Sequence, residues 1–153
     1  MAEVKVGEPA PNFNLKSSEG KTVSLQDYRG KKHVVLIFYP GDQTPGCTKQ
    51  LCSARDDTKA YEQAGAVVFG VNQGSEESHV RFVEKHKLTT PLLVDTNLLI
   101  SKEYDAVMGF GPLKLINRTV VVIDPAGKIV FYKRGMPNTS EIIASFSNTA
   151  SVS

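Results

Sequence analysis

The chemistry of this 153-residue chain centres on its two cysteines, Cys47 and Cys52. Thr44 and Pro45 stand just before Cys47, and threonine followed by proline is typical of a helix N-cap and first helical position. Cys47 then becomes the third residue of that helix, where unpaired backbone N–H groups and the positive end of the helix dipole favour a thiolate. This position predicts a reactive cysteine.

Cys52 follows on the same predicted helix, with four residues between the two cysteines. Five helical steps advance about 7.5 Å along the axis and turn about 140° around it, so the two Cα atoms stand beyond the roughly 7 Å that a disulfide allows. A bond between Cys47 and Cys52 therefore requires this helix to unwind. The spacing predicts a local conformational change if the two sulfurs bond.

Other interpretations of the cysteine pair fit less well. Two buried structural cysteines need no capped helix. A zinc site needs four ligands, which His33, His79 and His86 do not supply at finger-like spacing with a Cys-x4-Cys pair. A thioredoxin-type oxidoreductase is expected to carry Cys-x-x-Cys. That oxidoreductase and a non-enzymatic binding module stay as the alternatives to a thiol peroxidase, and a binding module would keep its function after Cys47→Ser.

Length and composition indicate a single domain over residues 1–153, with 147–153 as a frayed tail. Forty-one per cent hydrophobic and 22% charged residues are typical of a globular protein, and a net charge of +2 without a long like-charge run argues against a nucleic-acid partner. The longest apolar run, 34–39, is far shorter than the roughly 20 residues of a membrane span. The first residues resemble neither a signal nor a transit peptide, so we expect a cytoplasmic protein.

The pattern of apolar runs predicts an α/β fold that positions the cysteine helix. Continuous apolar runs predict strands buried on both faces of a sheet, at 34–39, 67–71, 92–94 and 119–123. Helices are predicted between and after these strands, at 45–64, 75–87, 97–106 and 140–146. We expect β-hairpins at 13–25 and around the turn 124–127, and a connecting loop at 108–112.

The segment Phe-Tyr-Pro-Gly-Asp-Gln-Thr-Pro-Gly-Cys-Thr at 38–48 resembles the active-site segment of peroxiredoxins. The family's Pro-x-x-x-Thr-x-x-Cys falls on Pro40, Thr44 and Cys47. Cys52, followed by Arg-Asp at 55–56, is similar to the peroxiredoxin Q group, also called bacterioferritin comigratory proteins. The resemblance extends from residues 7–13 through 117–124.

This resemblance implies a thioredoxin-like fold with an N-terminal β-hairpin extension and a central mixed sheet flanked by helices. It implies a peroxidase that reduces hydrogen peroxide and organic hydroperoxides without metal, haem or flavin. Cys47 matches the peroxidatic cysteine and Cys52 the resolving one. Arg118 matches the arginine that points at the thiolate, Thr44 the hydroxyl that bonds sulfur and peroxide, and Pro40 the proline that shields the pocket.

The same resemblance implies a protein partner, thioredoxin or alternatively glutaredoxin, that reduces a Cys47–Cys52 disulfide by thiol–disulfide exchange. It also implies a monomer, because both cysteines lie in one chain. Gln50 departs from the glutamate of many relatives, so a neutral hydrogen bond is expected to replace a carboxylate link to Arg118 or Arg55. Arg55 is expected to support Arg118, whereas His79 and His86 are interpreted as packing residues without chemistry.

Overall fold

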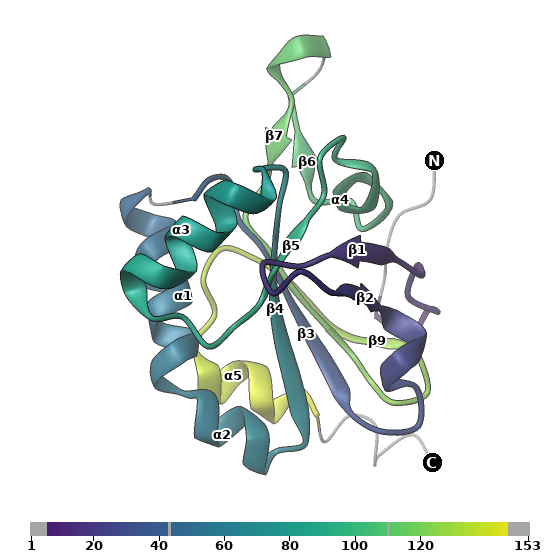
Figure 1. Cartoon of the computed structure of the whole chain (residues 1–153). Coiled ribbons are helices and arrows are strands. Elements are labelled where there is room, and N and C mark those ends of the chain that lie inside the picture. The colour runs from purple at the N-terminus through teal and green to yellow at the C-terminus, as the bar shows by residue number, and fades with distance from the viewer. Residues whose placement is uncertain (1–5, 43, 110, 147–153) are drawn as a thin grey trace.

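The computed structural model describes residues 6–42, 44–109 and 111–146, which build a five-stranded sheet covered on both faces (Figure 1). The strand order is β5 (Leu92–Val94), β4 (Ala66–Asn72), β3 (His33–Phe38), β8 (Thr119–Ile123) and β9 (Ile129–Arg134). The first three strands in this order run parallel to one another. Strand β8 pairs antiparallel with β3, and β9 pairs antiparallel with β8. The predicted α/β fold with a mixed sheet is confirmed.

The central strand β3 is apolar throughout because both of its faces are buried. Val35 and Ile37 belong to one core cluster, and Val34, Leu36 and Phe38 belong to the other. This alternation follows from the two-residue period of a strand, which points successive side chains to opposite faces. A strand with two buried faces reads as a continuous apolar run, as the sequence predicts.

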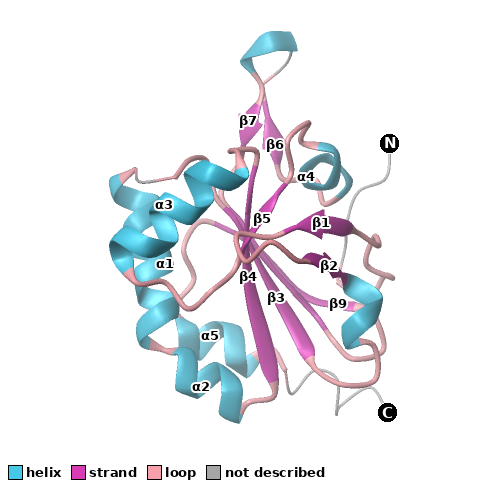
Figure 2. Cartoon of the chain, in the orientation of Figure 1, coloured by secondary structure: helices cyan, strands magenta, loops and turns pink. Residues whose placement is uncertain are grey.

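Helices gather on one face of the sheet, as the colouring of Figure 2 makes plain. These are α1 (Pro45–Asp56), α2 (Thr58–Gln63), α3 (Glu76–His86) and α5 (Thr139–Ala144). The other face is covered by the hairpin of β1 (Asn14–Lys16) and β2 (Thr22–Ser24), by the 3-10 helix η1 (Leu25–Tyr28) and by α4 (Leu99–Glu103). None of the helices in the described ranges is long and apolar enough to span a bilayer.

Two predicted helices differ in detail from the structure. The predicted helix over 45–64 is two helices, because the Thr58 hydroxyl donates to the Arg55 carbonyl (2.7 Å) and Asp57 leaves helical geometry at φ −100° and ψ 15°. The helix over 97–106 is shortened to α4, since Asp105 adopts a φ of 53°. The predicted tail at 147–153 lies outside the described residues.

The segment predicted as a loop at 108–112 belongs to a small hairpin. Strands β6 (Val107–Met108) and β7 (Leu115–Ile116) pair antiparallel, and the 3-10 helix η2 (Gly111–Leu113) lies between them. The hairpin projects from one end of the molecule (Figure 1). Strands of two residues carry too little periodicity for a sequence pattern to reveal them.

Candidate active site

Cys47 lies in the first turn of α1, as predicted. Thr44 is the N-cap residue with extended backbone (φ −77°, ψ 150°), and Pro45 is the first helical residue, so Cys47 is the third. The Cys47 side chain is fully buried, and its thiol is free. The Thr44 hydroxyl differs from the expected cap because it donates to the Gly41 carbonyl (3.0 Å) instead of accepting from the first turn.

Arg118 reaches Cys47 from the strand side of the molecule. Its Nη2 donates to the Cys47 Sγ at 3.3 Å, and its Nη1 donates to the Gln50 Oε1 at 2.7 Å. A Cβ at Gly46 would stand 3.1 Å from the Arg118 Nη2, so glycine at this position leaves room for the guanidinium. Arg118 directly precedes β8, and β8 pairs with β3, whose end leads into α1. Sheet pairing thus joins residues 71 positions apart in the chain.

Cys52 lies on the same continuous helix as Cys47, and its thiol is also free. It is partly buried and packs against the core cluster that contains Cys47. The intact α1 keeps the two sulfurs on different turns, as the spacing predicts. A disulfide between them requires part of α1 to unfold.

The arrangement of cysteine, arginine and helix N-terminus can be compared with known proteins. Residues 6–132 match the AhpC/TSA family. The chain belongs to this family of peroxiredoxins. Peroxiredoxin Bcp of Bacillus subtilis is 39% identical over 131 residues, which cover 83% of each chain. Chloroplastic peroxiredoxin Q of Triticum aestivum is 42% identical over 130 residues, 84% of this chain but 58% of the wheat protein.

Solved structures agree with this peroxiredoxin assignment and with the thioredoxin-like fold. A cysteine-to-serine mutant of the Xylella fastidiosa PrxQ superposes with a TM-score of 0.88 at 27% identity, over 98% of this chain and 99% of the other. Peroxidoxin BcpB of Mycobacterium tuberculosis gives the same TM-score at 25% identity, over 95% and 98% of the two chains. The similarity therefore places this peroxiredoxin in the Q and Bcp group.

The peroxiredoxin also contains a buried ionisable pair that the sequence did not reveal. The Asp42 Oδ2 lies 2.7 Å from the His79 Nδ1, and the two side chains are 7% and 0% exposed. Tyr39 donates to the Asp42 Oδ1 (2.6 Å), and Ser78 donates to the Asp42 Oδ2 (2.5 Å). The sequence predicts only a packed His79, from its helical spacing, and no local pattern links it to Asp42, 37 positions away.

The surroundings of Asp42 shift two pKa values. Burial raises the pKa of the Asp42 carboxyl, but hydrogen bonds from His79, Ser78 and Tyr39 outweigh burial and hold it below its ordinary value. Burial raises the pKa of the Tyr39 phenol well above its ordinary value, and the neighbouring Asp42 carboxylate adds to the rise. Asp42 is thus a carboxylate and Tyr39 a neutral donor across the physiological range.

Arg55 does not support Arg118, in contrast to the sequence-based expectation. Its Nη1 donates to the His86 carbonyl (2.5 Å), and its Nε donates to the Asp56 Oδ1 (3.0 Å). The carboxyl end of α1 is thereby joined to the end of α3, which lies beside it in Figure 1. Pro40 is half-buried in the loop before Cys47.

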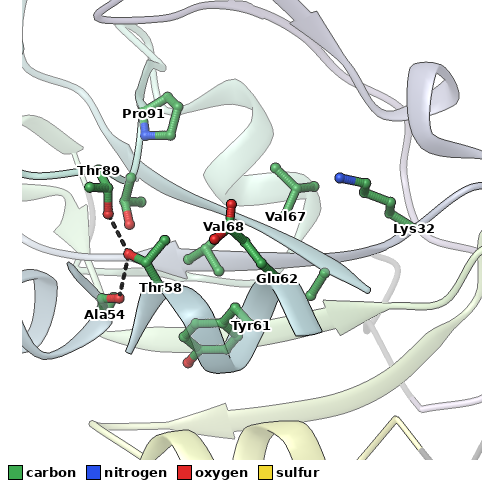
Figure 3. Close-up of a pocket in the computed structure, with 11 residues that line it drawn as sticks. Lys32, Ala54, Thr58, Tyr61, Glu62, Val67, Val68, Thr89 and Pro91 are labelled. Carbon is green, nitrogen blue, oxygen red and sulfur yellow. Dashed lines mark hydrogen bonds between the residues drawn. The ribbon is translucent and has the colours of Figure 1, made fainter. Parts of the chain in front are cut away.

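A cavity of about 160 Å³ lies away from the cysteines (Figure 3). Thr58, Tyr61, Glu62 and Pro91 are among the residues that line it, and neither Cys47 nor Cys52 does. The Thr58 hydroxyl within it already shares a hydrogen bond of 2.6 Å with the Thr89 hydroxyl. This cavity contributes no group to the peroxiredoxin site.

Proposed function

We propose that this peroxiredoxin is a thiol-dependent peroxidase that reduces hydrogen peroxide and organic hydroperoxides through Cys47, with Cys52 as the resolving cysteine. The observation that carries the proposal is the buried Cys47 Sγ in the first turn of α1 with the Arg118 Nη2 at 3.3 Å. The Xanthomonas campestris bacterioferritin comigratory protein, whose solved structure is 25% identical in sequence, is described as having alkyl peroxide reduction activity.

In the first step, the Cys47 thiolate attacks the terminal oxygen of the hydroperoxide. The O–O bond breaks, its electron pair goes to the leaving oxygen, and that oxygen takes a proton from water to become an alcohol or water. Cys47 is left as a sulfenic acid. The Arg118 guanidinium stays charged and stabilises both the thiolate and the negative charge that develops on oxygen.

Thr44 and Pro40 complete this proposed site. The Thr44 hydroxyl, which donates to the Gly41 carbonyl in the structure, is placed one helical turn before Cys47 and would turn its hydrogen bond towards the peroxide and the sulfur. Pro40, half-buried in the same loop, would shield the sulfur from water. A shielded site strengthens the electrostatic contacts made within it.

In the second step, the first part of α1 unwinds and the Cys52 thiolate attacks the Cys47 sulfenic sulfur. A disulfide forms as the S–O bond breaks, and the leaving hydroxide takes up the proton released by the Cys52 thiol and departs as water. The two cysteines stay oxidised until a reductant acts. A dithiol protein, thioredoxin or alternatively glutaredoxin, then reduces the disulfide by exchange and is itself oxidised. Because both cysteines lie in one domain of one chain, we propose a monomer, acting in the cytoplasm.

The test is intact mass and peptide mapping within seconds of adding one equivalent of hydrogen peroxide to the reduced protein. The wild type is expected to form a Cys47–Cys52 linkage. Cys52→Ser, the matched control, is expected to gain one oxygen at Cys47 as sulfenic acid, and a second oxygen, as sulfinic acid, when a further equivalent of peroxide is added. Cys47→Ser is expected to stay reduced. A wild-type protein that stays reduced, or a Cys52→Ser variant that turns over as fast as wild type with thioredoxin, would contradict the proposal.

A further inference from the structure

The carboxylate of Asp42 and the imidazole of His79 form a buried hydrogen-bonded pair, and each group has further partners. The His79 Nε2 lies 3.2 Å from the Leu93 carbonyl, which only accepts, so Nε2 carries a hydrogen. The Asp42 Oδ2 already accepts from Ser78, so the Nδ1 of His79 supplies the donor on its side of the 2.7 Å contact. Both ring nitrogens of His79 and both carboxylate oxygens of Asp42 are therefore engaged in hydrogen bonds.

This pair attaches the segment 39–42, which precedes Thr44 in the sequence, to the helix α3 that packs beside it. Asp42 lies in that segment, His79 in α3, and Leu93 in β5. Asn72, 2% exposed at the end of β4, donates through its Nδ2 to the Tyr39 carbonyl (2.7 Å) where the segment begins. Residues of α3 and β4 therefore contact this segment directly, and β5 contributes through its contact with His79. These contacts lie at the carboxyl ends of the parallel strands, where α/β sheets place their sites.

The same segment leads into the residues of the proposed site. Asp42 lies between Gly41 and Thr44 in the sequence. These two residues are joined by the hydrogen bond from the Thr44 hydroxyl to the Gly41 carbonyl. The first turn of α1, with Cys47, follows directly. A shift of the segment would move both the Thr44 hydroxyl and the helix N-terminus relative to the Arg118 guanidinium, which is anchored on another strand.

We propose that Asp42 and His79 are positioning residues of the peroxidase reaction, whose buried pair holds the segment 39–42 in the geometry that peroxide attack requires. This inference rests on the proposed function of Cys47. The pair touches neither peroxide nor sulfur. Its removal should thus impair the alignment of Thr44 and Cys47 more than the general reactivity of the thiolate.

The experiment compares two reactions of Cys47 in Asp42→Asn, His79→Gln and the double variant. The second-order rate of oxidation by hydrogen peroxide is expected to fall by roughly ten- to a hundredfold, because misplacement of reacting groups has effects of this size. Alkylation by iodoacetamide, which needs a thiolate but no aligned peroxide, is expected to be at least as fast as in wild type. The double variant should be no slower than the slower single one, because the two residues act as one unit.

Asp95→Asn is the matched control. Asp95 is 3% exposed, and its Oδ2 accepts from the Ser101 N (2.8 Å) and Oγ (2.7 Å) on the opposite face of the sheet. This variant loses a buried carboxylate and thermal stability but should keep the wild-type rate of peroxide oxidation. Equal slowing in Asp95→Asn and Asp42→Asn would overturn the inference, because the effect would then be general destabilisation.

Gly74→Ala tests the same coupling without removing a polar group. A Cβ there would stand 3.1 Å from the Asp42 Oδ2 and 3.2 Å from the His79 Cε1, so the pair must shift slightly. We expect Cys47 of Gly74→Ala to be oxidised by peroxide more slowly than Cys47 of wild type, as in the Asp42 and His79 variants. This variant tests the inference if Asp42→Asn does not fold. If Asp42→Asn, His79→Gln, the double variant and Gly74→Ala all kept the wild-type rate of oxidation by peroxide, the inference about Asp42 and His79 would be overturned, but the proposed function would not. A wild-type protein inert to peroxide would instead overturn the proposed function.

Discussion

At the scale of single residues, Arg118 contacts two side chains of the proposed site through one planar group. Its two terminal nitrogens hold the Cys47 Sγ and the Gln50 Oε1 at once, so the guanidinium plane is set by two hydrogen bonds. Gln50 is buried and offers a neutral acceptor. The positive charge of Arg118 is therefore available to the sulfur, while Gln50 contributes orientation.

Replacement of Arg118 by methionine keeps much of the side-chain volume but removes both hydrogen bonds and the charge. We expect the rate of peroxide oxidation of Cys47 to fall by about a hundredfold or more, which is the typical effect of losing one preorganised donor. The measurement is the second-order rate constant with hydrogen peroxide under single turnover. Arg81→Met, at an exposed position on α3, is the control and should react as wild type does. A similar rate in both variants would remove Arg118 from the proposed site.

At the scale of elements, α1 has two halves with different attachments. Its first turn and Gln50 are attached to the sheet side through Arg118. The region after Cys52 is attached more widely, since Arg55 donates to the His86 carbonyl and the Thr139 hydroxyl donates to the Asp57 carboxylate. Unwinding that brings Cys52 to Cys47 should therefore stop before Arg55.

Hydrogen exchange read by mass spectrometry can locate this boundary. In the disulfide form, the amides at 48–53 are expected to lose protection because their helical hydrogen bonds break, whereas those at 61–65 should keep it. Cys52→Ser treated with peroxide is the control, because it is oxidised without forming the disulfide. Loss of protection extending through α2, or none at all, would show that the attachments at Arg55 and Asp57 do not bound the unwinding.

At the scale of the whole molecule, the buried Tyr104 connects the N-terminal segment to the rest of the fold. Tyr104 is fully buried, and its hydroxyl donates to the Pro11 carbonyl (2.5 Å), which joins the N-terminal segment to the end of α4. Burial raises the pKa of the Tyr104 phenol well above its ordinary value of 10.0, and the nearby Glu103 carboxylate adds to the rise. The folded protein therefore binds this proton more tightly than the unfolded chain does.

The sign of this shift predicts an alkaline limit to stability. The contribution of Tyr104 is fully present below a pH of about 10 and is lost as the pH rises above it, because the unfolded chain releases the proton first. Tyr104→Phe should lose about 1 kcal/mol of stability at neutral pH, from the missing hydrogen bond, but decline less steeply above pH ~10. Urea unfolding at several pH values measures this. Tyr28→Phe, at a half-exposed ring, is the control and should change the slope less; equal slopes in wild type and Tyr104→Phe would contradict the assignment.

The sequence by itself determined the features that depend on neighbouring residues. Thr44 and Pro45 place the start of α1, and with it Cys47 in the first turn, because capping preferences act over a few residues. The apolar run of β3 reveals a strand with two buried faces, and Gly65, with a φ of 76°, follows the end of α2 as a glycine terminator does. The resemblance to peroxiredoxins also pointed to Arg118, which no local pattern distinguishes from a surface arginine.

The tertiary structure alone decided the contacts between distant segments. The pairing of β3 with β8 brings Arg118 to Cys47, and the packing of α3 over the sheet brings His79 to Asp42. The attachment of Arg55 to His86 instead of Arg118 follows from the same packing. Two polar side chains are buried against each other only where two elements meet and exclude water, and a sequence pattern carries no record of which elements meet. The position of Cys47 in the first turn of its helix was thus predictable from the sequence, whereas the contacts that surround it were set by the fold.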